Sequence, residues 1–388
     1  MASETSKAEM NFDYLGERLD LLRSEGRLRQ LVERSATGTR IVETDGREYV
    51  NFGGNDYLGL AAERSASPLS IGSTASALVC GWTPLHQQLA DRIAQLKGTE
   101  SAVLFPSGFA GCSGTIATMA EEGDLILSDE LNHASLIDGC RLSRAECVVY
   151  PHRGVRAVEQ LLKTKRSQFN RVWLATDSVF SMDGHVAPLR SLCKLAKRHD
   201  ATMIVDEAHA TGVLGETGSG LCEALGVKDQ VAIQIGTLSK AIGCQGGFVA
   251  APKLVVDYLI NRCRTLIYST ALAPPAVQAG IDALDSIRDE PQRREHVQAM
   301  SRLIRERLSI DTDAIENGVP IIPVLVGSDA KAVELSAALS EQGFFVPAIR
   351  PPTVPVETAR LRISVSAAHD QETVESLLKA LEDLLQSK

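Results

Sequence analysis

The sequence contains no closely spaced pair of cysteines. Its eight cysteines are scattered singly, and none belongs to a Cys-x-x-Cys motif, which argues against a zinc knuckle and a redox dithiol. We therefore expect reduced thiols in a cytoplasmic protein, because disulfides are rare in that compartment. The cysteines are Cys80, Cys112, Cys140, Cys147, Cys193, Cys222, Cys244 and Cys263.

Long apolar segments and an excess of positive charge are also missing. The polar N-terminus lacks the apolar core of a secretion signal, and Pro106 with three glycines divides the one long uncharged stretch, residues 101–120. No membrane span is expected. Forty lysines and arginines face forty-nine aspartates and glutamates, a formal charge of −9. This balance argues against nucleic acid or an anionic membrane as the main partner.

Short β-rich runs alternate with helical stretches between about residues 99 and 251. Such alternation requires crossover connections and predicts an α/β fold, with a mainly parallel sheet and helices on both faces. Long amphipathic helices and a few strands follow after about Asp289, which predicts a smaller α+β domain. We expect an N-terminal segment 1–71, a large domain 72–288 and a small domain 289–388. The seven runs are AVLF, LILS, CVVY, RVWLAT, MIVD, VAIQI and GGFVAA.

Polar residues follow five of the predicted strands. In an open parallel sheet, the loops after the strands and the helix N-termini converge on one edge, where ligands bind. We therefore expect these residues to form one site. They are Ser107, Gly108 and Phe109, then Asn132 and His133, then Asp177 and Ser181, then Asp206 to His209, and finally Thr237, Ser239 and Lys240.

Single residues of this set have simpler explanations. His133 could be a hydrogen-bonded structural residue, and Ser181 could only form a turn. Asp206 could cap the next turn or, with His209, bind a metal. Their occurrence together at five strand ends favours a functional site. His86, on a separate amphipathic helix, is expected to be structural.

The segment DEAH, residues 206–209, resembles the magnesium-binding element of helicase-type ATPases. Such enzymes also need a GxxxxGK[ST] loop, which the chain lacks. Lys240 moreover follows its strand directly, without a glycine-rich loop ahead of it. A nucleotide-hydrolysing function is therefore disfavoured.

A carbonyl-bearing cofactor explains the set better. Pyridoxal phosphate needs a lysine that forms an imine with its aldehyde, a carboxylate at its pyridine nitrogen and donors for its phosphate. Lys240 and Asp206 match the first two needs, and the flat ring of His133 suits the cofactor face. The phosphate candidates are Gly108, Phe109 and Thr237.

Seven linked motifs occur between Asn51 and His369, namely NDYLGL, SGFAG, NHASLIDG, FSMDG, DEAHATG, TLSKAIGCQGG and LIYST. Together, and in this order, they resemble the α-oxoamine synthases, fold type I pyridoxal-phosphate enzymes that condense an amino acid with an acyl-CoA and release CO2. The resemblance implies pyridoxal 5'-phosphate as the cofactor and no metal. It also implies a homodimer with the active site at the subunit interface.

The resemblance assigns roles to individual residues. Lys240 resembles the Schiff-base lysine, Asp206 the partner of the pyridine nitrogen, and His133 the histidine that stacks on the ring. His209 and Ser181 resemble residues near the phenolic oxygen, and His209 completes the expected catalytic set. The other assignments are Gly108, Phe109 and Thr237 at the phosphate, Ser269 and Thr270 reaching a phosphate in the partner subunit, Arg350 as the clamp for the amino-acid carboxylate, and Arg29, Asn55 and Thr353 as further substrate contacts.

The block from Ala348 to His369 is most similar to the family members that join L-alanine to a pimeloyl thioester in biotin biosynthesis. Glycine-using members, which make 2-amino-3-oxobutyrate or 5-aminolevulinate, share the core motifs and are the alternative. The chain departs from the family pattern in two places. The segment after Leu60 is shorter by about two helical turns, and Ala77 stands where many members have arginine.

Overall fold

A mixed seven-stranded sheet forms the centre of the computed structural model. The strands are β4 (Ser101–Phe105), β5 (Leu125–Asp129), β6 (Glu146–Tyr150), β7 (Val172–Asp177), β8 (Thr202–Asp206), β9 (Ile233–Thr237) and β10 (Gly247–Ala251). Their order is β4-β10-β9-β8-β7-β5-β6, and β10 runs in the opposite direction to the other six strands. The prediction of a mainly parallel sheet is therefore confirmed, with all seven strands. The structure describes residues 12–24, 28, 30–31, 33–37, 40–43, 46, 48–50, 70–310, 318–344, 346–351, 353–367 and 369–386.

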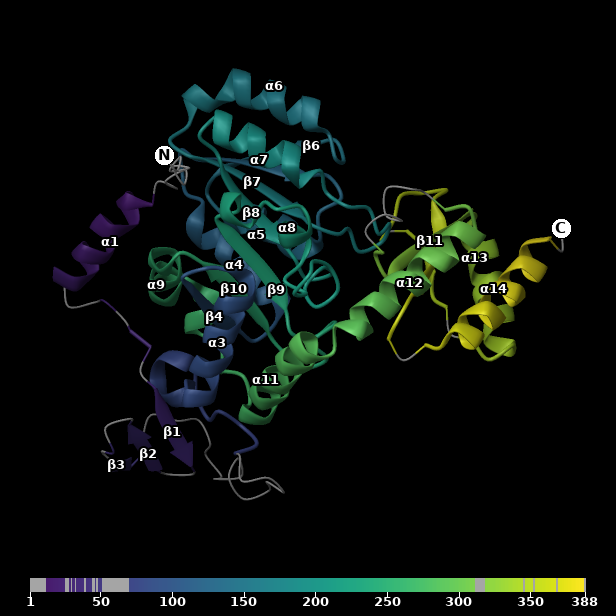
Figure 1. Cartoon of the computed structure of the whole chain (residues 1–388). Coiled ribbons are helices and arrows are strands. Elements are labelled where there is room, and N and C mark those ends of the chain that lie inside the picture. The colour runs from purple at the N-terminus through teal and green to yellow at the C-terminus, as the bar shows by residue number, and fades with distance from the viewer. Residues whose placement is uncertain are drawn as a thin grey trace, which may run out of the picture.

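Helices cover both faces of this sheet (Figure 1). Because side chains alternate along a strand, Ile204 of β8 packs into one core, and Met203 and Val205 pack into another. The helices of the first core are α1 (Asp13–Ser24), α3 (Pro84–Lys97), α4 (Gly108–Met119), α5 (Ala134–Leu142), α9 (Lys253–Arg262), α10 (Arg264–Ile267) and α11 (Pro274–Asp289). Those of the second core are α6 (Val155–Lys165), α7 (Leu189–Arg198) and α8 (Leu221–Ala224).

The N-terminal part of α3 forms as the sequence predicts. Pro84 occupies its first turn, where a missing N–H costs nothing. His86 is fully buried, with Nδ1 2.8 Å from Thr83 Oγ1 and Nε2 2.9 Å from the Leu272 carbonyl oxygen. Burial lowers the pKa of His86 to about 4, so the ring is neutral near pH 7. The structural role expected of His86 is confirmed.

A smaller antiparallel sheet lies near the C-terminus, and α12 (Pro291–Arg307) leads to it from the central part (Figure 1). The apolar faces of the amphipathic helices predicted after Asp289 pack into its core, for example through Met300 and Leu378. A short strand, β12 (Ala348–Ile349), follows Pro347, which has no N–H to donate to a ladder. The other elements are β11 (Ile321–Gly327), β13 (Ala359–Ser364), α13 (Asp329–Glu341) and α14 (Gln371–Gln386), in sheet order β11-β13-β12.

The chain bends between α11 and α12. Pro291 disfavours a helical conformation at the preceding residue, and Glu290 has φ −121° and ψ 58°. We propose that this bend marks the boundary between the large domain and the small domain. The N-terminal boundary at residue 71 stays a prediction.

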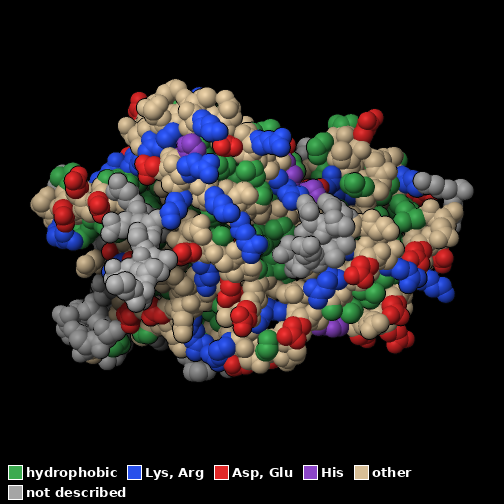
Figure 2. Space-filling model, turned by 45° about the horizontal axis from the view of Figure 1, so that its top comes forward, with side chains coloured by type: hydrophobic (Ala, Val, Ile, Leu, Met, Phe, Trp, Pro, Cys, Tyr) green, Lys and Arg blue, Asp and Glu red, His purple; other side chains and the backbone are tan. Residues whose placement is uncertain are grey.

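A third sheet and three short turns of helix complete the described chain. The sheet, in order β1-β2-β3, is antiparallel. None of the helices in the described ranges is long and apolar enough to cross a membrane. On the face seen in Figure 2, basic and acidic side chains are interspersed. The elements are β1 (Arg34–Thr37), β2 (Arg40–Glu43), β3 (Glu48–Val50), a π-helical turn (Ala77–Gly81) and two 3₁₀ turns (Arg166–Gln168 and Lys228–Gln230).

Candidate active site

The carboxyl ends of the parallel strands bring together the polar residues singled out in the sequence. Asp177 and Asp206 end β7 and β8 and lie opposite each other in the ladder. His133, just before α5, donates its main-chain N–H to Asp177 Oδ2 at 2.7 Å. Asn132 Oδ1 accepts the main-chain N–H of Asp177 at 2.9 Å. Three successive strand ends are thus joined directly by hydrogen bonds and pairing.

Asp206 is buried and firmly oriented. Its Oδ1 accepts the main-chain N–H of Ala208 at 2.8 Å, and its Oδ2 accepts the Cys112 thiol at 2.9 Å. Burial and the charge of Asp206 raise the pKa of Cys112 well above its usual value, so the thiol stays protonated and donates. The carboxylate is therefore held in one orientation at the edge of the sheet.

Asp177 gains a role that its place at a strand end did not reveal. Burial, and then repulsion by Asp206, raises the pKa of Asp177 well above its usual value. Asp177 is thus favoured in its protonated form beside Asp206. A negative charge at Asp206 suits a protonated ring nitrogen.

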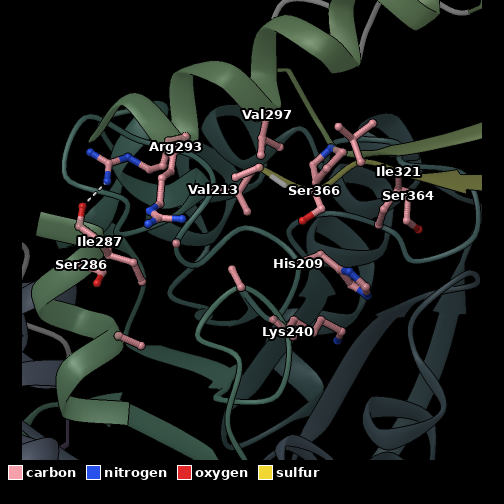
Figure 3. Close-up of a pocket in the computed structure, with 18 of the residues that line it drawn as sticks. His209, Val213, Lys240, Ser286, Ile287, Arg293, Val297, Ile321, Ser364 and Ser366 are labelled. Atoms are coloured by element: carbon pink, nitrogen blue, oxygen red, sulfur yellow. Dashed lines mark hydrogen bonds between the residues drawn. The ribbon is translucent and has the colours of Figure 1, made fainter. Parts of the chain in front are cut away.

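Lys240 and His209 lie close together at the cavity (Figure 3). Partial burial lowers the pKa of the Lys240 amine, although Asp206 and Asp177 oppose this shift. Burial, followed by the positive charges of Lys240 and Arg362, lowers the pKa of His209 to about 2. His209 is therefore neutral near pH 7. The lowered pKa of Lys240 increases the fraction of free amine, the form that attacks a carbonyl.

The N-terminus of α4 meets the end of β9. A Cβ atom on Gly108 would lie 3.0 Å from Thr237 Cβ, so only glycine allows this approach without movement. Thr237 Oγ1 donates to the Gly246 carbonyl oxygen at 3.0 Å and lies 2.7 Å from Ser239 Oγ. The first N–H groups of α4 have no helical carbonyl ahead of them, and such an end favours an anion. The main-chain N–H groups at this helix end therefore fit a phosphate.

His133 and Ser181 border the same edge. The His133 ring is fixed by Ser135, whose Oγ lies 2.8 Å from Nδ1, and burial lowers its pKa. The Ser181 carbonyl oxygen accepts Arg362 Nε at 2.7 Å. The neighbouring Asp183 pairs with Arg360. Two arginines of β13 therefore fasten the small sheet to the FSMDG turn.

Arg362 is the site residue that the sequence reasoning missed. It lines a cavity of about 740 Å³ together with Lys240 and His209. The available signal was the alternation in RLRISVS, which places Arg360 and Arg362 on one face of β13. Burial lowers the pKa of Arg362. This cavity is lined by Ala208, His209, Gly212, Val213, Lys240, Ala241, Ala283, Ser286, Ile287, Glu290, Arg293, Arg294, Val297, Pro320, Ile321, Arg362, Ser364, Val365, Ser366 and Ala367.

Several expected site residues lie elsewhere. Arg350 and Thr353 are exposed in the turn after β12, outside the lining of that cavity. Ser269 and Thr270 lie beside Trp82 in a different pocket. The side chain of Phe109 is 46% exposed at the start of α4. Arg29, Asn55 and the short segment after Leu60 lie outside the described residues.

The metal alternative gains no support from the site. Over the described ranges, no group of three or more histidine, cysteine, aspartate or glutamate side chains is arranged to hold a metal ion. Asp206 instead uses its oxygens for Ala208 and Cys112. The set of a lysine, a carboxylate, a helix N-terminus and a fixed histidine ring fits pyridoxal phosphate.

The chain is similar to known proteins along nearly its whole length. A model of the family described as "Aminotransferase class I and II" matches residues 47–381. The 8-amino-7-oxononanoate synthase of Anaeromyxobacter dehalogenans is 44% identical over 382 residues, 96% of each chain. A solved serine palmitoyltransferase of Sphingomonas wittichii is 29% identical, with a TM-score of 0.78 over 99% of this chain and 98% of the other. Another, from S. paucimobilis with a bound pyridoxal-phosphate adduct, is 25% identical, with a TM-score of 0.77 over 96% and 97%.

Proposed function

The chain belongs to the aminotransferase class I and II family and, within it, to the α-oxoamine synthases, and we propose that it joins L-alanine to a pimeloyl thioester. It is a fold type I, pyridoxal-phosphate-dependent acyltransferase. The proposed products are 8-amino-7-oxononanoate, CO2 and free CoA or carrier protein, in biotin biosynthesis. The observation that carries this choice is the 44% identity, over 96% of each chain, to the 8-amino-7-oxononanoate synthase of Anaeromyxobacter dehalogenans.

The residues at the strand ends would hold the cofactor. We assign Lys240 to its aldehyde, Asp206 to its ring nitrogen and His133 to its ring face. When bound, pyridoxal phosphate accepts electrons from the amino-acid Cα and so eases loss of a proton or CO2. The phosphate site would be formed by Gly108, Phe109 and Thr237, with Ser181 and His209 near the phenolic oxygen.

The protein's own side chains supply binding and proton transfer. The lowered pKa of Lys240 suits an amine that takes the Cα proton of alanine and returns one after carbon–carbon bond formation. Arg362 is better placed than Arg350 to bind the alanine carboxylate, because it lines the cavity beside Lys240. Its Nε and Nη1 already bind the Ser181 carbonyl and Ser364 Oγ, which fixes the planar fork.

We also propose that the enzyme is a cytoplasmic homodimer. Ser269 and Thr270 line a pocket other than the Lys240 cavity within one chain, and we assign their expected phosphate contact to the second subunit. A variant with Thr270→Ala should then lose cofactor affinity without any change around Lys240 of its own chain. A purely monomeric active enzyme would contradict this arrangement.

The test pairs amino acids with acyl donors. Purified protein loaded with pyridoxal phosphate is mixed with L-alanine or glycine and with pimeloyl-CoA or acetyl-CoA, and CoA release is followed. We expect the fastest release with L-alanine and pimeloyl-CoA, and its loss in Lys240→Ala with the fold retained by circular dichroism. A preference for glycine and acetyl-CoA would overturn the choice in favour of glycine C-acetyltransferase. Protein that shows no visible band of lysine-bound cofactor would contradict the role of Lys240.

A further inference from the structure

The cavity beside Lys240 is lined by both charged and aliphatic side chains. Among the described residues, four cationic side chains, Lys240, Arg293, Arg294 and Arg362, line it, against a single acidic one, Glu290. The wall between them is largely aliphatic. Such a lining suits a ligand that is anionic at its ends and hydrocarbon in the middle. The aliphatic residues are Ala208, Val213, Ala241, Ala283, Ile287, Val297, Ile321, Val365 and Ala367.

The two arginines of α12 differ in what they are free to bind. Arg294 is buried, and its guanidinium donates to the Ile287 carbonyl and, at 2.7 Å, to the Glu216 carbonyl. Arg294 therefore has a structural role, because its donors bind main-chain carbonyls. Arg293 has a side chain 61% exposed, and its Nε donates to Glu290 Oε2 at 2.7 Å. An exposed ion pair of this kind is weak, so a substrate carboxylate can compete for Arg293.

Arg293 also lies at the end of the cavity that is remote from Lys240. Figure 3 shows it on the opposite side from Lys240, with Val213 between them in this view. A chain that reacts at Lys240 and passes Val213 would present its far end to Arg293. A short acyl group such as acetyl would not span this space.

We propose, on the basis of the function proposed above, that the cavity receives the methylene chain of the pimeloyl group and that Arg293 binds its terminal carboxylate. The carboxylate stays in contact with water at the cavity mouth, so its charge is not desolvated in the apolar part. The planar guanidinium can donate two parallel hydrogen bonds to it. Arg293 is thus the residue that distinguishes a dicarboxylic acyl donor from a plain fatty acyl donor of equal length.

The experiment compares Arg293→Gln with wild type on three donors. Pimeloyl-CoA carries both the terminal carboxylate and the CoA phosphates, heptanoyl-CoA lacks the carboxylate, and the pimeloyl thioester of N-acetylcysteamine lacks the phosphates. We expect kcat/KM to fall roughly tenfold for both pimeloyl donors and to stay unchanged for heptanoyl-CoA, because a hydrogen-bonded charge pair is worth about 1.5 kcal/mol. Arg288→Gln removes a similarly exposed charge of α11 outside the cavity lining and should change none of them.

Other patterns would overturn the assignment. A loss confined to the two CoA donors would mean that Arg293 binds CoA phosphates. An equal loss on all three donors would mean that it only supports the structure.

A binding measurement separates this inference from the proposed function. Calorimetry of the holoenzyme with pimelate and with heptanoate should show tighter binding of pimelate in wild type and equal binding in Arg293→Gln. If wild-type protein prefers glycine and acetyl-CoA but binds pimelate through Arg293, the proposed function is contradicted and the carboxylate site at Arg293 is supported. Equal binding of both acids by wild type would overturn the site, whichever substrates react.

Discussion

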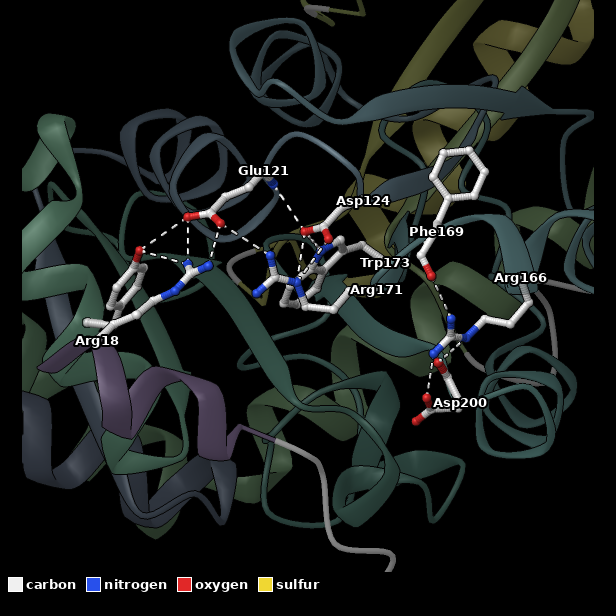
Figure 4. Close-up of polar contacts among 9 residues, drawn as sticks. Arg18, Glu121, Asp124, Arg166, Phe169, Arg171, Trp173 and Asp200 are labelled. Carbon is white, nitrogen blue, oxygen red and sulfur yellow. Dashed lines mark hydrogen bonds and ion pairs between the residues drawn. The ribbon is translucent and has the colours of Figure 1, made fainter. Parts of the chain in front are cut away.

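Two networks of cations and carboxylates hold the protein together in opposite surroundings. Behind the DEAH segment, Lys97 Nζ lies 3.1 Å from Glu207 Oε2, and neither side chain is exposed. At the N-terminal helix, Arg18 binds Glu121 at 2.6 and 2.7 Å, with side chains 36% and 38% exposed (Figure 4). The same kind of ion pair therefore lies in the interior in one region and at the surface in the other.

The interior pair is saturated with hydrogen bonds. Lys97 Nζ also donates to Thr211 Oγ1 at 2.8 Å and to the Ser219 carbonyl oxygen, and Glu207 Oε1 accepts the main-chain N–H of Cys222 at 3.0 Å. A buried ion pair is tolerated only when such partners replace water. Glu207 follows Asp206 directly in the chain. The pair thus fixes the main chain that carries the site carboxylate.

The surface network becomes more exposed to water from the inside outward. Asp124 is fully buried and accepts Arg171 Nε at 2.9 Å and Trp173 Nε1 at 3.2 Å. Arg171 also binds Glu121 at 3.2 Å, and Arg18 comes last (Figure 4). Water competes more strongly at each step, so the network fastens α1 without specifying the site. The comparison teaches that burial, and not the number of ion pairs, decides how much each pair contributes to the free energy of unfolding.

The largest effect is expected from Lys97→Met. The methionine fills most of the space but leaves the Glu207 charge buried and unpaired, so the free energy of unfolding should fall by about 3–5 kcal/mol. Urea denaturation of the holoenzyme measures this. Lys253→Met is the control, because Lys253 pairs with Asp257 in an exposed i,i+4 contact and should change stability by less than about 0.5 kcal/mol. Equal losses in the two variants would refute the distinction between interior and surface.

A second substitution should restore part of this loss. In Lys97→Met with Glu207→Gln, the amide keeps an acceptor for the Cys222 N–H, and no buried charge remains unpaired. We expect the double variant to be more stable than Lys97→Met alone by about 1–3 kcal/mol, and urea denaturation of both single variants and the double variant gives the coupling energy. Additive losses would show that the two side chains act independently.

The sequence predicted the strand ends and not these networks, for physical reasons. Asp206 and Lys240 follow short apolar runs, and the geometry of a parallel sheet alone brings such positions together. Lys97 reads as an ordinary cation in the last turn of α3, and only the folded chain buries it against Glu207, 110 positions away. Arg362 was missed for the same reason, because its partner Ser181 lies 181 positions away. Contacts between distant side chains leave no periodic signal.

An intermediate effect is expected from Arg171→Met. This change removes the charged donor of the buried Asp124, but Trp173 Nε1 and the main-chain N–H of Glu121 still bind that carboxylate. The free energy of unfolding should fall by about 2 kcal/mol, between the interior pair and the surface pair. Urea denaturation of Arg171→Met and Lys97→Met under the same conditions ranks their losses of stability. A loss larger than that of Lys97→Met would place the stronger network at α1.

A small effect is expected from Arg18→Met. Its pair with Glu121 is partly exposed, so stability should fall by about 0.5–1 kcal/mol at low ionic strength and by less at 1 M salt. Because Leu15 and Leu19 remain packed, α1 should stay attached but open more often. Hydrogen exchange of the α1 amides measures this opening. Exchange at the wild-type rate would show that packing alone fastens the helix.

The smallest effect is the pH dependence of the stability difference between wild type and Arg18→Met. Burial alone would raise the pKa of Glu121, but Arg18 and Arg171 outweigh it and lower the pKa below its usual value. A carboxyl with a lowered pKa in the folded state adds stability above about pH 4.5 and loses it as the pH falls through its folded pKa. The difference in unfolding free energy between wild type and Arg18→Met should therefore shrink from pH 6 towards pH 3. A difference that is constant over this range would mean that Arg18 contributes through its contact with the Tyr14 ring, 5.3 Å from Cζ to the ring centre, and not through its ion pair with Glu121.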